Sequence, residues 1–239
     1  VGIGEVFIVA GQSNAVGQGT SNQVYAGTAG LFSVYGNDYH AKTGTDPVDS
    51  SQGQVDGISL DTAKGSVWPL IATSFVTAQN VPIMFIPCPL SGSAILAWLP
   101  GTNHQDRLTL YGSMVYRALQ QPGGIHAVLW WQGEADALAG QTQNYYYANL
   151  TTLAAAVLAD IGCKLMPCKL QNSSGISDGN EALINAAIAQ AWSDNVSTTL
   201  TGPDLSGLAT DDSFHFTTDA KLALAAALWW TAIQTAFSF

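Results

Sequence analysis

Short apolar runs alternate with longer amphipathic segments along this chain. The apolar runs at residues 6–10, 81–87, 127–131 and 164–170 have the length of strands, and turn-forming or polar residues bound each of them. They are too continuous to be strands with one exposed face, so they predict a parallel sheet that is covered on both faces.

The segments between these runs have the spacing of helices. Segments 68–79, 108–120, 144–160 and 180–193 carry apolar residues three and four positions apart, with Pro or Gly near several ends. They predict crossover helices, and the Ala-rich segment 218–239 predicts a C-terminal helix that packs on the sheet. The alternating order favours one α/β domain over residues 1–239, built as a three-layer α/β/α sandwich with a central, mostly parallel sheet.

Residues 17–64 differ from the rest of the chain. This stretch is rich in Gly, Ser, Thr, Asn and Asp and has little periodicity, so we expect a long irregular excursion. Long loops in compact domains are usually functional or disordered. The excursion is therefore a candidate wall for a substrate cleft.

Composition and charge narrow the range of partners. Hydrophobic residues make up 47% of the chain and charged residues only 10%, against roughly 25% charged residues in typical soluble domains. Seven Lys and Arg against seventeen Asp and Glu give a net charge of −10, which repels phosphate backbones and anionic membrane surfaces. We therefore expect neither nucleic acid nor a membrane as a partner, whereas a surface rich in hydroxyl and amide groups suits neutral polysaccharide.

The sequence also bears on where the protein is located. No apolar run reaches the ~18 residues that span a bilayer, and residues 1–5 lack the layout of a signal peptide. The composition is common in secreted and virion proteins, so we expect an extracellular or virion-associated localisation. The oligomeric state stays open.

Three cysteines allow two interpretations. Cys163 and Cys168 are close enough in sequence to close a small loop by a disulfide, which would leave Cys88 over. The favoured alternative is that all three thiols are reduced and buried.

The first segment with chemical content is the end of the run at residues 6–10. Gly11, Gln12, Ser13 and Asn14 follow this buried strand directly. Ligands of open α/β sheets bind at the carboxyl edge, and a helix that begins there points backbone N–H groups at a developing anion. Ser13 is therefore a candidate nucleophile, although a serine in this place is also a common helix N-cap.

The second segment lies just before the C-terminal helix. Asp212 precedes His215 by three residues, which allows the carboxylate to orient the imidazole. A serine hydroxyl needs a base to remove its proton, and an imidazole base needs a carboxylate to fix its tautomer. Asp211 is a competing carboxylate, and a solvated turn is the alternative interpretation of both aspartates.

Two further segments carry candidate groups for stabilising an oxyanion. Gln132 and Glu134 follow the run at 127–131, so Gln132 offers an amide donor at the same sheet edge as Ser13. Gly92, after the run at 81–87, allows a backbone N–H to approach a reacting carbonyl. Taken singly, each segment is also compatible with an ordinary turn.

Together and in this order, the four segments resemble the SGNH hydrolase superfamily over the whole chain. The similarity is closer to its branch of sialate O-acetylesterases and plant-type acetylxylan esterases. That branch carries Gly-Gln-Ser-Asn after the first strand, a Gly-Gly-Thr-like turn followed by Ile and Trp, a Trp-x-Gln-Gly-Glu segment, and Asp-x-x-His near the end. The matching positions here are 11–14, 91–98, 130–134 and 212–215.

The resemblance implies a role for each matching residue. Ser13 is the nucleophile, His215 the general base and then acid, and Asp212 its orienting partner. The backbone N–H groups of Ser13 and Gly92 and the side chain of Gln132 form the oxyanion hole. The residues expected to support the site or contact substrate are Gln12, Asn14, Glu134 and Trp98.

Two positions depart from the pattern of the branch. Ser91 stands where a glycine is common, and Ala220 stands where a glycine often follows the histidine. Neither change removes a reacting group. The first bears on the shape of the oxyanion turn and the second on the start of the last helix.

The implied activity is the removal of O-acetyl groups from carbohydrate by a serine esterase that needs no metal or other cofactor. Trp68, Trp98, Trp130 and Trp131 are candidate stacking faces for sugar rings, with Trp98 the best placed, although tryptophans beside apolar runs are more often core residues. The alternatives on the same fold are a lipid or thioester hydrolase and a non-catalytic carbohydrate-binding or virion structural domain. The other histidines, His40, His104 and His126, are expected to be surface or loop residues.

Overall fold

The protein is built around one six-stranded sheet. The computed structural model describes residues 4–48, 54–59 and 64–239, and within them the strand order is β3-β2-β4-β1-β5-β6. The four predicted strands are present as β1 (Glu5–Gly11), β4 (Ile83–Pro87), β5 (Ala127–Trp131) and β6 (Lys164–Pro167). These four pair in parallel, which confirms the predicted α/β class.

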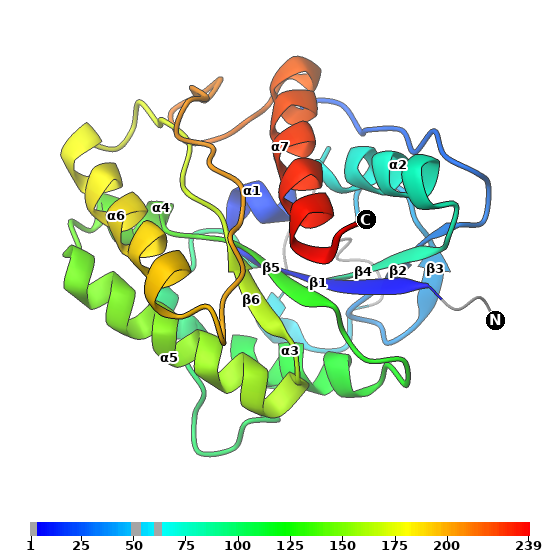
Figure 1. Ribbon diagram of the computed structural model, residues 1–239, viewed down its shortest axis with the longest axis horizontal. Helices are drawn as coiled ribbons and strands as arrows, with labels where there is room; N and C mark the ends of the chain where they lie inside the picture. The colour runs from blue at the N-terminus through cyan, green and yellow to red at the C-terminus, as the bar shows by residue number, and fades with distance from the viewer. Residues whose placement is uncertain (1–3, 49–53, 60–63) are drawn as a thin grey trace.

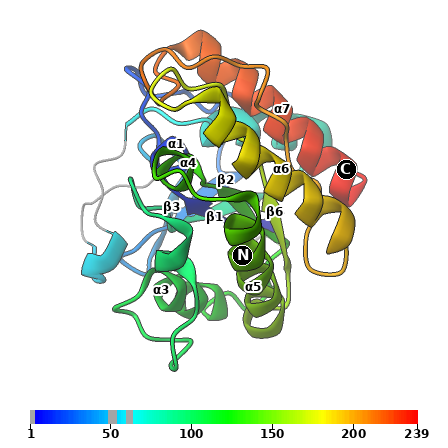
Figure 2. The same ribbon diagram turned by 90° about the vertical axis from the view of Figure 1, so that its left-hand side faces the viewer.

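Helices cover both faces of the sheet, as Figures 1 and 2 show. On one face lie α2 (Trp68–Gln79) and α7 (Asp219–Phe237), and on the other lie α3 (Leu110–Leu119), α5 (Gln143–Ile161) and α6 (Asp178–Asp194). Four short elements complete the described structure: α1 (Ser13–Val16), α4 (Glu134–Leu138), η1 (Gly57–Ser59) and η2 (Ile95–Trp98). The predicted three-layer sandwich is therefore confirmed.

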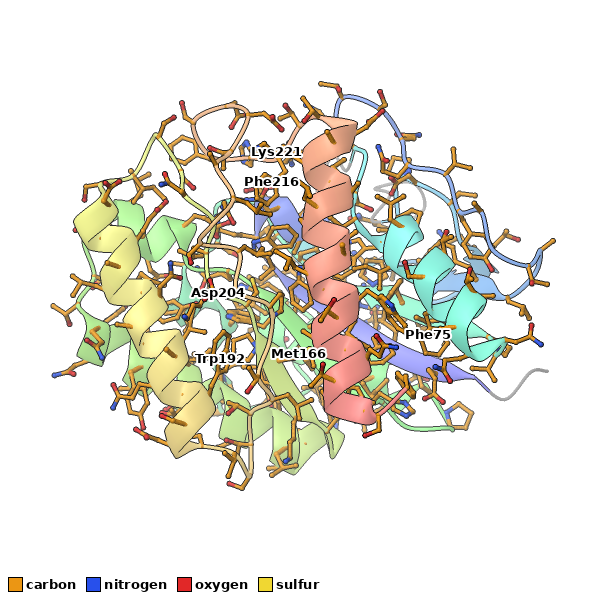
Figure 3. The ribbon with its side chains drawn as sticks, turned by 45° about the horizontal axis from the view of Figure 1, so that its top comes forward. Phe75, Met166, Trp192, Asp204, Phe216 and Lys221 are labelled. Atoms are coloured by element: carbon orange, nitrogen blue, oxygen red, sulfur yellow. The ribbon has the colours of Figure 1, made fainter. Side chains whose placement is uncertain are left out.

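The alternation of strand side chains explains why the strands read as continuous apolar runs. Phe7 and Val9 of β1 pack toward α2 and α7, whereas Ile8 and Ala10 pack toward α3, α5 and α6. Successive side chains of a strand point to opposite faces, and here both faces are covered. Figure 3 shows the first of these two layers, with Phe75 of α2, Met166 of β6 and Phe216 beside α7.

The excursion at 17–64 is more regular than expected. It contains β2 (Phe32–Tyr35), which pairs in parallel with β4, and β3 (Ala41–Thr43), which runs antiparallel to β2 at the edge of the sheet. Both strands are so short that their alternation spans too few residues to stand out in the sequence. Residues 49–53 and 60–63 of the excursion lie outside the described residues.

The cysteines are reduced and buried, as the favoured interpretation expected. Cys163 and Cys168 are free thiols, and Cys88 is also buried. Burial raises the pKa of the Cys163 thiol to about 12. The disulfide alternative is therefore wrong, and these side chains act as small apolar core residues.

Within the part of the chain that the structure describes, no helix has the length and apolar character needed to cross a membrane.

Candidate active site

Two neighbouring strands deliver the candidate residues to one edge of the sheet. Gly11 ends β1 opposite Trp131 at the end of β5, and the next backbone N–H, that of Gln12, donates to the Trp131 carbonyl at 2.9 Å. Gly11 has a φ of +127°, and a Cβ at this position would lie 2.0 Å from the Trp131 oxygen. Only glycine fits here, so the close approach of the two strand ends is built into the sequence.

Ser13, His215 and Asp212 form a connected set, although they come from opposite ends of the chain. Ser13 Oγ lies 2.9 Å from His215 Nε2, and His215 Nδ1 lies 3.1 Å from Asp212 Oδ2. When Nδ1–H donates to the carboxylate, Nε2 is left with a lone pair that accepts the hydroxyl proton of Ser13. The arrangement has the geometry of a nucleophile, a base and an orienting acid.

The two adjacent aspartates have separate tasks, which resolves the choice left open by the sequence. Asp211 accepts hydrogen bonds from the backbone N–H groups of Thr217 and Thr218 and from the Thr218 hydroxyl, so it anchors the start of α7. Asp212 is the carboxylate that faces His215.

Asp212 is ionised despite its contact with the protein. Partial burial favours the neutral acid, but the backbone N–H groups of Phe214 and His215 donate to Oδ1 at 2.7 Å and 2.6 Å. Together with the His215 ring, these donors outweigh burial and hold the pKa of Asp212 below its ordinary value. A negative charge is therefore fixed beside the imidazole.

Two residues with candidate backbone donors, Ser13 and Gly92, line the same cavity. Ser13 is the first residue of α1, so its N–H has no acceptor within that helix. Gly92 lies in the turn after β4 with a φ of +71°, which favours glycine, and it is one of the residues that line the cavity described below. Both N–H groups are therefore candidate oxyanion donors.

An open cavity of about 380 Å³ contains the reacting groups. Its lining residues are Gln12, Ser13, Gln18, Ser91, Gly92, Glu134, Ala135, Leu138, Phe214 and His215. Gln18 is the one described residue of the excursion among them. The described part of the excursion therefore contributes little to the cavity wall, and its two strands, β2 and β3, lie at one edge of the sheet.

The side chain of Gln132 does not lie at the cavity, contrary to the sequence-based prediction. The residue is fully buried and does not line the cavity, and its Nε2 donates to Asp136 Oδ2 at 2.6 Å and the Ser93 carbonyl at 3.0 Å, with Gln12 Oε1 at 3.2 Å. An amide nitrogen has two hydrogens, and these three acceptors use them. The expectation that Gln132 supplies an oxyanion donor is corrected: its side chain holds neighbouring segments together.

Asn14 and Glu134 position the loop that carries His215. Asn14 Nδ2 donates to Glu134 Oε1 at 2.9 Å and to the Phe214 carbonyl at 3.0 Å, while its Oδ1 accepts from Phe216 N–H at 3.2 Å. The backbone on both sides of His215 is thus tied to α1. Both residues support the site, as expected.

Gln171 joins this network, and the sequence analysis missed it. Its Nε2 donates to Glu134 Oε1 at 3.0 Å and to the Phe214 carbonyl at 3.3 Å, and its Oε1 accepts from Trp131 Nε1 at 3.2 Å. The available signal was its place shortly after the run at 164–170, at the same carboxyl edge of the sheet.

Asp136 is the second residue that the sequence analysis missed. It is nearly fully buried, and its Oδ2 accepts from Gln132 Nε2 and from Ile95 N–H at 2.9 Å. Burial raises the pKa of Asp136, and the hydrogen bonds from Gln132 and Ile95 only partly oppose this effect. The contacts join α4 to η2, which follows the Gly92 turn.

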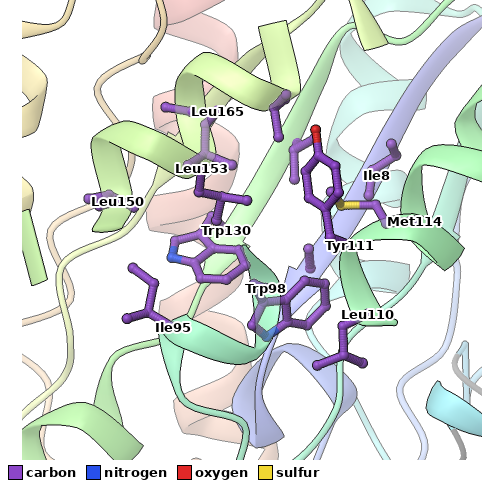
Figure 4. Packing of buried hydrophobic residues seen from close by; sticks show 14 of the residues in the cluster. Ile8, Ile95, Trp98, Leu110, Tyr111, Met114, Trp130, Leu150, Leu153 and Leu165 are labelled. Carbon is purple, nitrogen blue, oxygen red and sulfur yellow. The ribbon is translucent and has the colours of Figure 1, made fainter. Parts of the chain in front are cut away.

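Trp98 belongs to the core and not to the cleft. Its exposure is 0%, its ring meets Trp130 edge to face at 5.2 Å, and its Nε1 donates to Ser93 Oγ at 2.9 Å. Figure 4 shows both indoles packed among Ile95, Leu110 and Leu150. Trp68, Trp130 and Trp131 are likewise fully buried, so none of the four rings offers a stacking face to a sugar.

Among the described residues, no group of three or more His, Cys, Asp or Glu side chains has an arrangement that could hold a metal ion. His104 and His126 pair with Asp160 and Glu5 at the surface, and His40 is exposed.

Comparisons with known proteins point to one family. Residues 3–234 match a family described as carbohydrate esterase, sialic acid-specific acetylesterase. The sequence is 26% identical over 195 residues to a probable carbohydrate esterase, At4g34215, from Arabidopsis thaliana. The match covers 76% of this chain but 65% of that relative, so the chain spans less than two thirds of its length.

Solved structures with the same fold include esterases. The Arabidopsis protein has a TM-score of 0.74 at 22% identity, covering 97% of this chain and 98% of that chain. A carbohydrate acetylesterase from Xanthomonas citri has a TM-score of 0.68 at 16% identity, covering 99% and 57%. NanS has a TM-score of 0.69 at 17% identity, covering 98% and 97%. These likenesses agree with the resemblance to SGNH hydrolases in fold.

Proposed function

Because the chain belongs to the family of carbohydrate esterases described as sialic acid-specific acetylesterases, we propose that it removes O-acetyl groups from carbohydrate with Ser13 as nucleophile. The observation that carries this proposal is the contact of Ser13 Oγ with His215 Nε2 at 2.9 Å, inside an open cavity. A serine hydroxyl in that position is activated by a base and accessible to an ester.

Acylation of the enzyme is the first half of the reaction. His215 Nε2 takes the hydroxyl proton while Ser13 Oγ attacks the ester carbonyl carbon. The tetrahedral intermediate carries a negative oxygen, which the N–H groups of Ser13 and Gly92 stabilise. The imidazolium then protonates the sugar oxygen as the ester bond breaks, and the acetyl group stays on Ser13 Oγ.

Deacylation repeats these steps with water. His215 removes one proton from a water molecule that attacks the acetyl-serine and returns this proton to Ser13 Oγ. Acetic acid leaves with the second proton of the water and releases it to solvent as it ionises to acetate. Asp212 remains ionised throughout, because its charge stabilises the imidazolium in both halves of the reaction. No redox step or additional co-substrate is needed for the balance.

The substrate class rests on the family and on the character of the cavity. An O-acetylated sugar of a polysaccharide or of sialic acid fits an open site with amide, hydroxyl and apolar groups on its wall. The net charge of −10 favours neutral glycans over strongly anionic ones. An extracellular or virion-associated setting stays a prediction.

The first experiment measures release of acetate from acetylated xylan and from O-acetylated sialic acid, together with hydrolysis of p-nitrophenyl acetate and butyrate. Ser13→Ala is compared with Ser74→Ala, a matched change on α2 where the hydroxyl only donates to the Leu70 carbonyl. We expect turnover of acetyl esters that is lost in Ser13→Ala and kept in Ser74→Ala.

Other outcomes identify the alternatives. A preference for longer acyl chains contradicts the acetylesterase proposal in favour of a lipid or thioester hydrolase. Glycan binding without any turnover, in a protein whose thermal unfolding is cooperative, contradicts catalysis and favours a binding domain.

A further inference from the structure

The oxyanion site lacks the side-chain donor that the sequence predicted. The N–H groups of Ser13 and Gly92 supply two donors, and the amide expected as the third, Gln132, is buried and engaged elsewhere. Another side-chain amide, that of Gln12, does line the cavity. It precedes Ser13 in the chain and comes from the same strand end.

The orientation of the Gln12 amide is fixed by its oxygen. Oε1 accepts from the backbone N–H of Ala135 at 3.1 Å, from that of Gly133 at 3.5 Å, and from Gln132 Nε2 at 3.2 Å. A backbone N–H can only donate, so the oxygen and not the nitrogen must face α4. The oxygen of the Gln12 amide therefore faces α4, and the nitrogen takes the other position.

The orientation of Gln132 is fixed in a similar way. Its Nε2 faces the Ser93 carbonyl and the Asp136 carboxylate, and an oxygen in that place would meet two acceptors. Its own oxygen accepts from the Tyr146 hydroxyl at 2.9 Å. Gln132 cannot turn its donors toward the cavity without abandoning these partners.

The nitrogen of Gln12 is left facing the cavity. Within residues 4–48, 54–59 and 64–239, Gln12 Nε2 donates to no acceptor. The polar atoms that are fully enclosed without a partner do not include it. It is therefore open to solvent although the residue as a whole is only 4% exposed. A donor whose orientation is fixed by the hydrogen bonds of its own amide oxygen has the preorganisation that oxyanion stabilisation requires.

We propose that the side-chain amide of Gln12 is the third oxyanion donor. This inference rests on the proposed function, and it adds the donor that distinguishes this site from one with two backbone donors alone. Gln12 transfers no proton: one Nε2–H bond turns from water to the carbonyl oxygen of the ester and strengthens as that oxygen becomes negative. Gln132 and α4 act as the frame that keeps the amide in this orientation.

The test separates the two halves of the amide. Gln12→Glu keeps an oxygen that can accept from Gly133 and Ala135 but removes the donor. We expect kcat for p-nitrophenyl acetate to fall about 100-fold or more with little change in KM, because the lost interaction forms only in the transition state.

Two comparison variants exclude a simple effect of charge. Gln18→Glu adds the same charge to the same cavity and is expected to lower kcat less than tenfold. Gln12→Met removes the donor without adding charge and is expected to lower kcat about as much as Gln12→Glu. A Gln12→Met enzyme that keeps wild-type kcat would overturn the proposal.

A structural measurement on the wild-type protein covers the case in which the Gln12 variants do not fold. An alkyl fluorophosphonate that reacts with Ser13 gives a tetrahedral adduct with a phosphonyl oxygen in the oxyanion position. In its crystal structure we expect Gln12 Nε2 about 2.7–3.1 Å from that oxygen, with Gln132 Nε2 still on Asp136. Contact from Gln132 instead of Gln12 would overturn the proposal.

Failure of this inference differs from failure of the proposed function. A wild-type protein that neither hydrolyses acetyl esters nor reacts with the phosphonate contradicts the function itself. A wild-type protein that does both, while Gln12→Glu stays within fivefold of its kcat, contradicts only the assignment of Gln12.

Discussion

The 211–216 loop and the buried network around α4 both hold side chains of the candidate active site, each through an aspartate. Asp212 holds His215 and has a side chain that is 49% exposed, whereas Asp136 holds Gln132 and is 1% exposed. Both carboxylates accept hydrogen bonds from backbone N–H groups. The pKa of Asp212 is nevertheless lowered, whereas that of Asp136 is raised.

The difference shows how the same side chain serves two purposes. At the surface, two short backbone hydrogen bonds together with the His215 ring outweigh partial burial and lower the pKa of Asp212, so its charge can stabilise charge on His215. In the interior, the loss of solvent outweighs the hydrogen bonds of Asp136, and the residue acts by its geometry. Disruption of the loop should therefore affect the chemical step, while disruption of the network should affect folding as well.

The largest expected effect comes from the loop. His215→Ala removes the base, and we expect kcat for p-nitrophenyl acetate to fall about 10⁴- to 10⁶-fold. The midpoint of thermal unfolding should change by only a few degrees, because the ring is held mainly by Ser13 and Asp212. Retention of more than a tenth of the activity would show that another group acts as base.

Asp212→Asn tests the orienting role and comes next in size. We expect kcat to fall about 10²- to 10⁴-fold, with the smaller figure favoured by the exposure of the side chain to water. Asp211→Asn is the matched control. It should leave kcat near the wild-type value and lower only stability, because Asp211 contacts the start of α7. The reverse ranking would exchange the roles of the two residues.

Gln132→Leu tests the buried network. It leaves Asp136, the Ser93 carbonyl and Gln12 Oε1 without their common donor, so we expect the free energy of unfolding to fall by about 3 kcal/mol. Urea denaturation measures this loss. If stability is unchanged and kcat alone falls 100-fold or more, Gln132 is an oxyanion donor after all.

The smallest expected effect is the pH dependence of stability, which should differ in sign between the two aspartates. The lowered pKa of Asp212 adds stability above the ordinary pKa of about 3.9, and this contribution is lost as pH falls through the folded-state value below it. The raised pKa of Asp136 makes the contribution of this carboxyl group to stability most favourable below about pH 3.9. This contribution falls as pH rises toward the folded-state pKa.

Urea unfolding of the wild type, Asp212→Asn and Asp136→Asn between pH 3 and 7 checks these signs. The advantage of the wild type over Asp136→Asn should shrink with rising pH, and that over Asp212→Asn should grow until about pH 4 and then stay constant. A common trend in both variants would contradict the contrast between the loop and the network.

Much of the fold was predictable because its long elements carry strong local signals. The run at 127–131 and the segment at 68–79 coincide with β5 and α2. The short strands β2 and β3 were not predicted, because four and three residues give too little alternation and the pairing of β2 with β4 is a long-range contact.

The residues of the candidate site were also predicted only in part. Ser13, Asp212, His215 and Gly92 were named from short segments that follow or precede regular elements. In the structure Ser13, Gly92 and His215 line one cavity, and Asp212 contacts His215. The amide expected at the oxyanion position was assigned to Gln132, and Trp98 was assigned to the cleft. Both assignments failed because a residue type at the end of a strand or in the turn region after it does not reveal which way its side chain points.

The sequence by itself determined the alternation of strands and helices, the reactive residue types and the glycines that permit close backbone approach. These properties are local, since each depends on a few neighbouring residues. Only the tertiary structure decided which aspartate meets His215, that Gln132 is enclosed by acceptors, and that the amide of Gln12 faces the cavity. The choice between the aspartates depends on how the backbone of the 211–218 segment turns. The other two outcomes depend on hydrogen bonds between residues as far apart as 12 and 132, and no local pattern encodes the direction of such contacts.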